Sequence, residues 1–88
     1  MKVQNMTGKN GRAIPNQFII HSSIGTAFFQ SYNSMIAVKT NDNKIELDRD
    51  TWDYSRTTSK YRNMFLGLTT KEIKAKIKSG EILLVNLN

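Results

Sequence analysis

The segment from Asp53 to Asn63 carries residue types that commonly contact a binding partner. It interleaves two tyrosines, two arginines and four aliphatic hydroxyls, in the order Asp-Tyr-Ser-Arg-Thr-Thr-Ser-Lys-Tyr-Arg-Asn. Tyrosine rings stack on nucleobases, and arginines and hydroxyls bind phosphates. Tyrosine and arginine are also enriched at protein–protein interfaces. The segment therefore predicts a contact surface and leaves open whether the partner is a nucleic acid or a protein.

Lysines extend this basic character toward the C-terminus. Residues 54–80 carry seven basic groups and one acidic group. At about 100° per residue, Lys71, Lys74 and Lys78 share one face of a helix. Such a face attracts phosphates or an acidic protein, although lysines also keep a small protein soluble. The predicted partner-binding residues are Tyr54, Arg56, Lys60, Tyr61, Arg62, Lys71, Lys74 and Lys78.

Side chains for catalysis or metal binding are sparse. His21 is the only histidine and the chain has no cysteine. A nucleophilic triad would have to combine this histidine with a neighbouring serine and a distant carboxylate, so a structural or exposed histidine is favoured. Asp48, Asp50 and Asp53 lack the glycine and final glutamate of a calcium-binding loop, which favours a solvated turn. We therefore expect that the protein is not an enzyme and that it binds neither a metal nor a cofactor.

The hydrophobic pattern predicts the elements that must position these residues. Alternating apolar and polar residues indicate strands over 17–21, 26–32, 34–40 and 44–48, joined by short turns into an antiparallel meander. Apolar residues from Tyr61 to Leu68 then recur at helical spacing. This first helix is expected to begin at Thr58 or Ser59 and to end at Gly67.

A second helix is expected directly afterwards. Its start matches the capping box formed by Thr69 and Glu72, and Gly80 would end it. Residues 81–87 predict a last strand that is apolar on both faces, which suits the inside of a sheet or contact with a partner. Trp52 is expected to cap the core, with an exposed binding hot spot as the alternative.

The predicted fold class is therefore α+β: a small antiparallel sheet or open barrel of about five strands, packed by one or two short helices near the C-terminus. Residues 1–16 are polar and contain Pro15, which predicts a flexible N-terminal lead-in. Residues 17–88 would form a single α+β domain.

Composition limits the remaining possibilities. With 88 residues, the chain has room for one small domain. Its net charge is +6 at pH 7. No apolar run reaches the roughly 18 residues that span a membrane, and the N-terminus does not resemble a secretion signal. We expect a basic globular domain in the cytoplasm, as a monomer or homodimer without membrane contact.

A set of short stretches within residues 13–67 forms a recognisable pattern. The stretches are Phe28–Ala37, Leu47-Asp48, Trp52–Ser55, Thr57-Thr58 and Lys60–Leu66. In these residues the chain resembles a family of small uncharacterised proteins encoded by bacteriophages and mobile elements of low-GC Gram-positive bacteria. The resemblance implies no catalytic residue, but it does imply a context, because small phage proteins without enzymatic equipment are often inhibitors of host defence, and anti-CRISPR proteins are of this kind.

These observations lead to two main functional hypotheses. The first is a non-enzymatic, phage-encoded protein that inhibits a bacterial defence nuclease, such as a Cas effector, by occupying a binding site. Its partner would be a bacterial host protein, such as a nucleoprotein nuclease. The second is a basic accessory protein that uses the same surface on DNA or RNA. A structural module that pairs through the apolar last strand is a third possibility.

Overall fold

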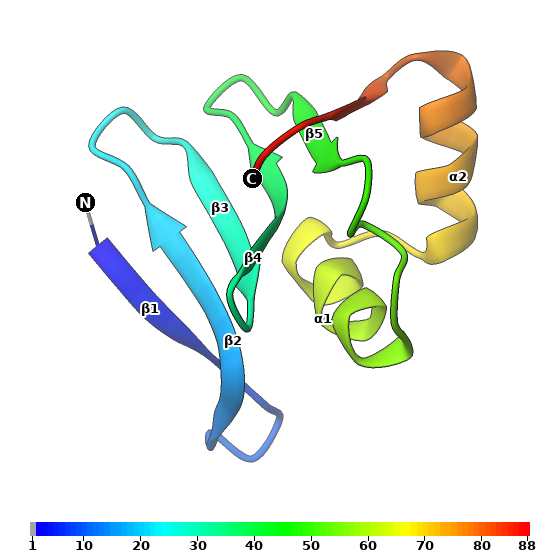
Figure 1. The fold of residues 1–88 in the computed structure, drawn as a ribbon. Coiled ribbons are helices and arrows are strands. Elements are labelled where there is room, and N and C mark those ends of the chain that lie inside the picture. Colours follow the sequence, from blue (N-terminus) through cyan, green and yellow to red (C-terminus); the bar gives the residue numbers. More distant parts are fainter. Residues whose placement is uncertain (1) are drawn as a thin grey trace.

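The alternating residues in the first half of the chain form consecutive strands of one sheet. The computed structural model describes residues 2–88. Within these residues, six strands lie side by side in chain order, so that β1 and β6 are the two edges of an open sheet (Figure 1). The strands are β1 (Lys2–Thr7), β2 (Ala13–His21), β3 (Ala27–Ser31), β4 (Ser34–Lys39), β5 (Ile45–Asp48) and β6 (Ile82–Val85), and the helices are α1 (Arg56–Leu66) and α2 (Thr70–Ser79). The predicted α+β fold class is confirmed.

The N-terminal segment differs from the sequence-based expectation. Instead of a lead-in, residues 2–7 form β1, which pairs with β2, and β2 already begins at Ala13. Pro15 is accommodated because the register between the two strands shifts beyond Asn5. Residues at such a bulge are not paired with the neighbouring strand, so the N–H that proline lacks leaves no ladder hydrogen bond unmade. The Asn5 side-chain amide bridges this irregular stretch by donating to the Ile14 carbonyl at 2.7 Å and the Gln17 carbonyl at 3.3 Å.

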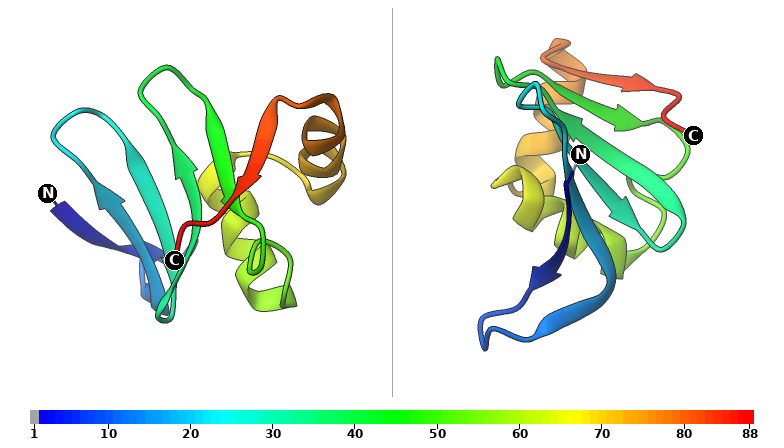
Figure 2. Two further views of the ribbon diagram at one scale, coloured as in Figure 1. Left: turned by 45° about the horizontal axis from the view of Figure 1, so that its top comes forward. Right: turned by 90° about the vertical axis from the view of Figure 1, so that its left-hand side faces the viewer.

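The helices pack against one face of the sheet (Figure 2). A row of paired residues crosses this face from Ile19 through Phe29 and Ala37 to Leu47. Phe29, Ala37 and Leu47 are fully buried there. Leu66 of α1 and Ile73 of α2 are buried in the same cluster. The core is therefore a single layer of side chains between the sheet and two short helices.

The helix boundaries follow from capping side chains. Ser55, and not Thr58 or Ser59, caps α1, because its Oγ accepts a hydrogen bond from the Thr58 N–H at 3.1 Å. Thr58 lies instead in the interface with the sheet, where its hydroxyl is 3.0 Å from that of Ser31. Gly67 ends α1 in the left-handed conformation, as predicted.

The second helix agrees closely with the prediction, whereas the last strand agrees only in its position along the chain. Thr69 and Glu72 form the predicted capping box, and Gly80 ends α2. β6 pairs with β5 in the parallel direction, because the two helices carry the chain back to the starting end of β5 before β6 begins. The sheet is therefore mixed, whereas an antiparallel sheet was expected.

The buried carboxylate of Asp48 binds the backbone of Leu87 near the C-terminus. Asp48 is 1% exposed. It accepts hydrogen bonds from the Leu87 N–H at 2.9 Å and the Thr51 hydroxyl at 2.8 Å. Its burial raises the pKa of the Asp48 carboxyl, but these and further hydrogen bonds outweigh that effect and lower the pKa overall.

Candidate binding surface

One side of α1 presents a stripe of two cations and a methionine to solvent. Arg56, Lys60 and Met64 are all exposed and follow one another at intervals of four residues. The opposite side of the helix buries Thr58, Arg62 and Leu66. The stripe therefore points away from the sheet, on the side of the molecule that carries the helices.

The solvent face of α2 is basic as well. Lys71, Lys74 and Lys78 are exposed, as the helical spacing predicts, while Ile73 is buried. Lys76 lies on a different side and pairs with Glu81 at 3.0 Å. Within residues 2–88, five helix cations form no ion pair. They define the basic helix surface: Arg56, Lys60, Lys71, Lys74 and Lys78.

Arg62 does not belong to this surface, which corrects the sequence-based assignment. Its side chain is fully buried. The guanidinium donates to the Trp52 carbonyl, to the Thr70 hydroxyl at 3.1 Å and to the Asn63 side-chain oxygen at 3.0 Å. It also lies 3.4 Å from the Asp53 carboxylate. A guanidinium with all these internal partners is not accessible to another molecule.

Arg62 instead joins three segments of the fold. Its partners come from the β5–α1 connection, from α1 itself and from the first residue of α2. Burial lowers the pKa of the Arg62 guanidinium, and Asp53 opposes this effect, so the group remains charged at every physiological pH. The positions of the two basic helices therefore depend on this arginine.

The aromatic residues near α1 separate into core and surface. Trp52 is half-buried against the core, with the Arg62 guanidinium 5.3 Å from its ring centroid. The interpretation of Trp52 as a core cap is confirmed. Tyr54, in contrast, is 52% exposed. It lines a shallow hollow of about 380 Å³ together with Arg56 and Ser59.

A cleft that the sequence did not indicate lies between α1 and the β1–β2 turn. It has a volume of about 400 Å³. Lys9 contributes from the turn, and Lys60 contributes from the helix. Its apolar lining comes from Ile14, Tyr61 and Met64. Lys9 was missed because roughly fifty residues separate it from the helix, and only the pairing of β1 with β2 brings it near.

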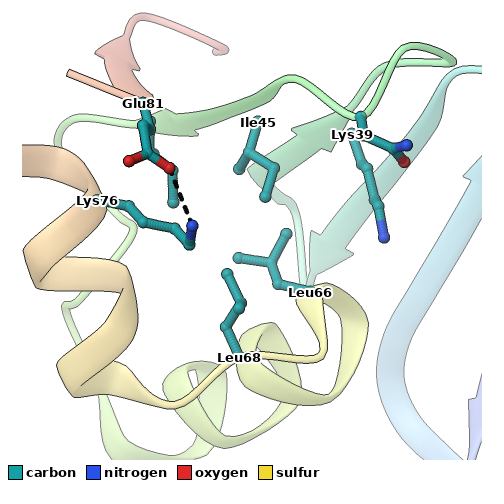
Figure 3. Close-up of a pocket in the computed structure, with 8 residues that line it drawn as sticks. Lys39, Ile45, Leu66, Leu68, Lys76 and Glu81 are labelled. Atoms are coloured by element: carbon teal, nitrogen blue, oxygen red, sulfur yellow. Dashed lines mark hydrogen bonds and ion pairs between the residues drawn. The ribbon is translucent and has the colours of Figure 1, made fainter. Parts of the chain in front are cut away.

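A second cleft lies where the helices meet the other end of the sheet (Figure 3). Its volume is about 270 Å³, slightly below the roughly 300 Å³ at which small-molecule pockets begin. Lys76 is bound to Glu81 there and is not free to bind an anion. Its lining consists of Lys39, Asn43, Ile45, Leu66, Leu68, Lys76, Glu81 and Ile82.

The face of the sheet opposite the helices carries an apolar row. The paired positions run from Val3 through Ile20, Phe28 and Val38 to Leu83, with Glu46 between the last two. Val3 is 63% exposed and Leu83 is 53% exposed. Among residues 2–88 no helix covers this face (Figure 2). The apolar last strand thus lies at an edge of the sheet with two leucines exposed.

The other residues considered for chemistry lie apart. His21 is exposed on β2, and Asp48 is committed to the chain end. Within residues 2–88, no three histidine, cysteine, aspartate or glutamate side chains gather in a group able to hold a metal ion. Neither helix in that range is long and apolar enough to cross a membrane.

Comparison with known proteins gives a family but no function. The model of DUF8033, a family of unknown function, matches residues 1–81. No curated protein and no solved structure matches the chain. The matched range includes both helices and the first five strands, and thus every residue of the basic helix surface.

Proposed function

Because this chain belongs to the DUF8033 family, whose function is unknown, we propose a function from its own surface: it is a non-enzymatic binding protein that engages a partner containing nucleic acid. The basic helix surface supports this proposal above all other features. Five unpaired cations on two neighbouring helices attract a polyanion strongly, since each phosphate that a cation neutralises releases a counterion.

The partner class that we place first is a bacterial defence nuclease with its nucleic acid bound, such as a Cas effector. The protein would then be a phage-encoded inhibitor of the anti-CRISPR type, acting in the cytoplasm of the bacterial host. This choice rests on the resemblance over residues 13–67. Direct binding to free DNA or RNA, as an accessory protein, is the alternative that the same surface favours.

Electrostatics restricts how such an inhibitor would bind. Effectors of this kind hold their nucleic acid in a positively charged channel. A protein with a net charge of +6 is repelled from an empty channel of the same sign. We therefore place the basic helix surface on the nucleic acid that the effector already holds, and we expect loaded effector to bind more tightly than unloaded effector.

Two triple variants with the same net charge test this assignment. Replacing Lys71, Lys74 and Lys78 by alanine removes three cations from the basic helix surface. The second variant removes three cations elsewhere by alanine replacement of Lys2, Lys44 and Arg49. These residues are all exposed and lie on the strands or their connections. If the surface carries binding, only the first variant loses affinity and shows a weaker dependence on salt.

The measurement is binding to loaded effector, unloaded effector and free guide RNA at two salt concentrations. Tighter binding to the loaded effector than to the unloaded effector or to free RNA supports inhibition, and cleavage assays then test it directly. Equal binding to free RNA favours the accessory protein. Equal losses in the two triple variants would mean that only net charge matters, and the site assignment would be abandoned.

A further inference from the structure

The cleft between the β1–β2 turn and α1 combines features that the basic helix surface lacks. Its residues come from two distant parts of the chain, with Lys9 and Ile14 on one side and Lys60, Tyr61 and Met64 on the other. The β1–β2 turn bends toward the side of the sheet that carries the helices (Figure 2). The turn and α1 thereby form the two walls.

Both walls are held in place by internal contacts. In the turn, the Gly8 N–H donates to the Arg12 carbonyl at 2.9 Å, and the Gly11 N–H donates to the Gly8 carbonyl at 3.0 Å. On the other side, Tyr61 packs against the hydrophobic core, as does Ile14. The cleft is therefore formed before any ligand arrives, which spares a ligand the cost of ordering it.

The chemistry of the cleft is apolar inside and cationic at its rim. Ile14, Tyr61 and Met64 supply the apolar surface, and Met64 is 47% exposed. Neither Lys9 nor Lys60 forms an ion pair within residues 2–88. The Lys60 ammonium lies 5.4 Å from the centroid of the Tyr61 ring, at the end of a long side chain that can turn aside. A matching occupant has a flat, apolar body and an anionic group beside it.

We propose that this cleft holds one unpaired nucleobase against Tyr61 and Met64, with Lys9 and Lys60 on the flanking phosphates. The inference deepens the proposed function and rests on it, because it names single-stranded nucleic acid as the form that the protein recognises. Paired bases stay inside the stack of a duplex and do not enter such a cleft, whereas unpaired bases are free to stack on an aromatic side chain.

Fluorescence anisotropy with labelled oligothymidine and with a duplex of equal length tests the inference. We expect the single strand to bind at least about fivefold more tightly than the duplex, because one stacked base contributes at least that much affinity. Tyr61→Leu keeps an apolar side chain but removes the ring, and it should weaken single-strand binding by about 5- to 150-fold. Tyr61→Phe retains the ring and should bind like the original protein.

The lysines and the fold are checked with matched variants. Lys9→Ala should reduce the slope of log affinity against log salt by about 0.7. Lys44→Ala, another exposed lysine in a turn between strands, should leave single-strand preference unchanged. Should Tyr61→Leu lower the thermal stability, Met64→Ala takes its place, because this exposed residue lines the same cleft. Cross-linking with 5-iodouracil should label Tyr61 or Met64.

The outcomes separate the two proposals. Equal affinity for single strand and duplex, full binding by Tyr61→Leu, or cross-links confined to α2 would overturn the cleft assignment, while the basic helix surface would stand. If Tyr61→Leu loses binding to the effector and neither protein binds an oligonucleotide, the cleft holds an aromatic side chain of a protein partner. That result would also overturn the nucleobase assignment. No binding to loaded effector or to any oligonucleotide would overturn both proposals.

Discussion

Replacing Arg62 by alanine should destabilise the protein strongly, although a basic residue in a basic segment would ordinarily be taken for a surface residue. The guanidinium is fully buried and donates to the Trp52 carbonyl, the Asn63 side chain and the Thr70 hydroxyl. Alanine would remove these donated hydrogen bonds and open a void between α1, α2 and the β5–α1 connection.

The size of the effect follows from these contacts. A hydrogen bond to a charged group contributes about 1.5–3 kcal/mol, and a buried acceptor left alone costs about 1–3 kcal/mol. The Thr70 hydroxyl still accepts from the Asn63 side-chain amide at 3.0 Å, whereas the Asn63 side-chain oxygen loses its Arg62 donor. Asp53 is 41% exposed, so its ion pair adds less than about 1 kcal/mol. We therefore expect a loss of about 3 kcal/mol in the free energy of unfolding.

Urea denaturation followed by the fluorescence of Trp52 measures this loss. For a domain of this size it corresponds to a decrease in Tm of about 12–24 °C. Arg56→Ala is the matched control, because this arginine is exposed on the same helix and its loss should change stability by less than about 0.5 kcal/mol. Arg62→Lys keeps the charge but not the several N–H donors of the guanidinium. Its free energy of unfolding should lie between those of Arg62→Ala and Arg56→Ala.

A free energy of unfolding for Arg62→Ala within about 1 kcal/mol of the original protein would show that the Arg62 guanidinium does not stabilise the fold through these contacts. In that case the arginine would be accessible and would return to the list of candidate binding residues. The result also decides how binding experiments are read, since a variant that lacks Arg62 would lose binding by unfolding.

Two further predictions concern the supports of the candidate surface. Asp48→Asn should destabilise the protein at neutral pH, and its difference in free energy of unfolding from the original protein should shrink as the pH falls below about 4. The reason is that the Asp48 pKa is lower in the folded protein than its ordinary value of 3.8. The stability that the ionised carboxylate contributes is present above pH 3.8 and is lost as the pH falls through the folded-state pKa. Unfolding curves between pH 7 and pH 2 test this, and a constant difference would contradict it. Gly67→Ala should cost about 1 kcal/mol because Gly67 has φ +68°, whereas Gly67→Asn should cost less; equal melting temperatures for all three proteins would show that the left-handed end of α1 is not required.

Much of the fold is specified by local sequence. The capping box of Thr69 and Glu72, the glycines that end both helices and the alternating pattern of four strands act over a few residues, and the structure contains each of them. The exposed face of Lys71, Lys74 and Lys78 is equally local, because helical periodicity alone places these residues together.

The missed features depend on contacts between distant residues. β1 has few apolar residues and becomes a strand because β2 offers it an edge, and Pro15 is tolerated because it lies where the pairing is irregular. Nothing near Lys9 in the sequence indicates that this residue meets α1. No local pattern indicates that β6 would run parallel to β5 either.

The clearest division appears within α1. Local sequence is enough to predict a helix with basic side chains that ends at Gly67, since helix formation and charge are local properties. The orientation of Arg62 toward Trp52 and Thr70, with Arg56 and Lys60 facing solvent, depends on the tertiary structure, because burial of an arginine requires acceptors from other segments to meet around it. The same composition thus supplies a structural residue and a candidate binding surface on opposite sides of one helix.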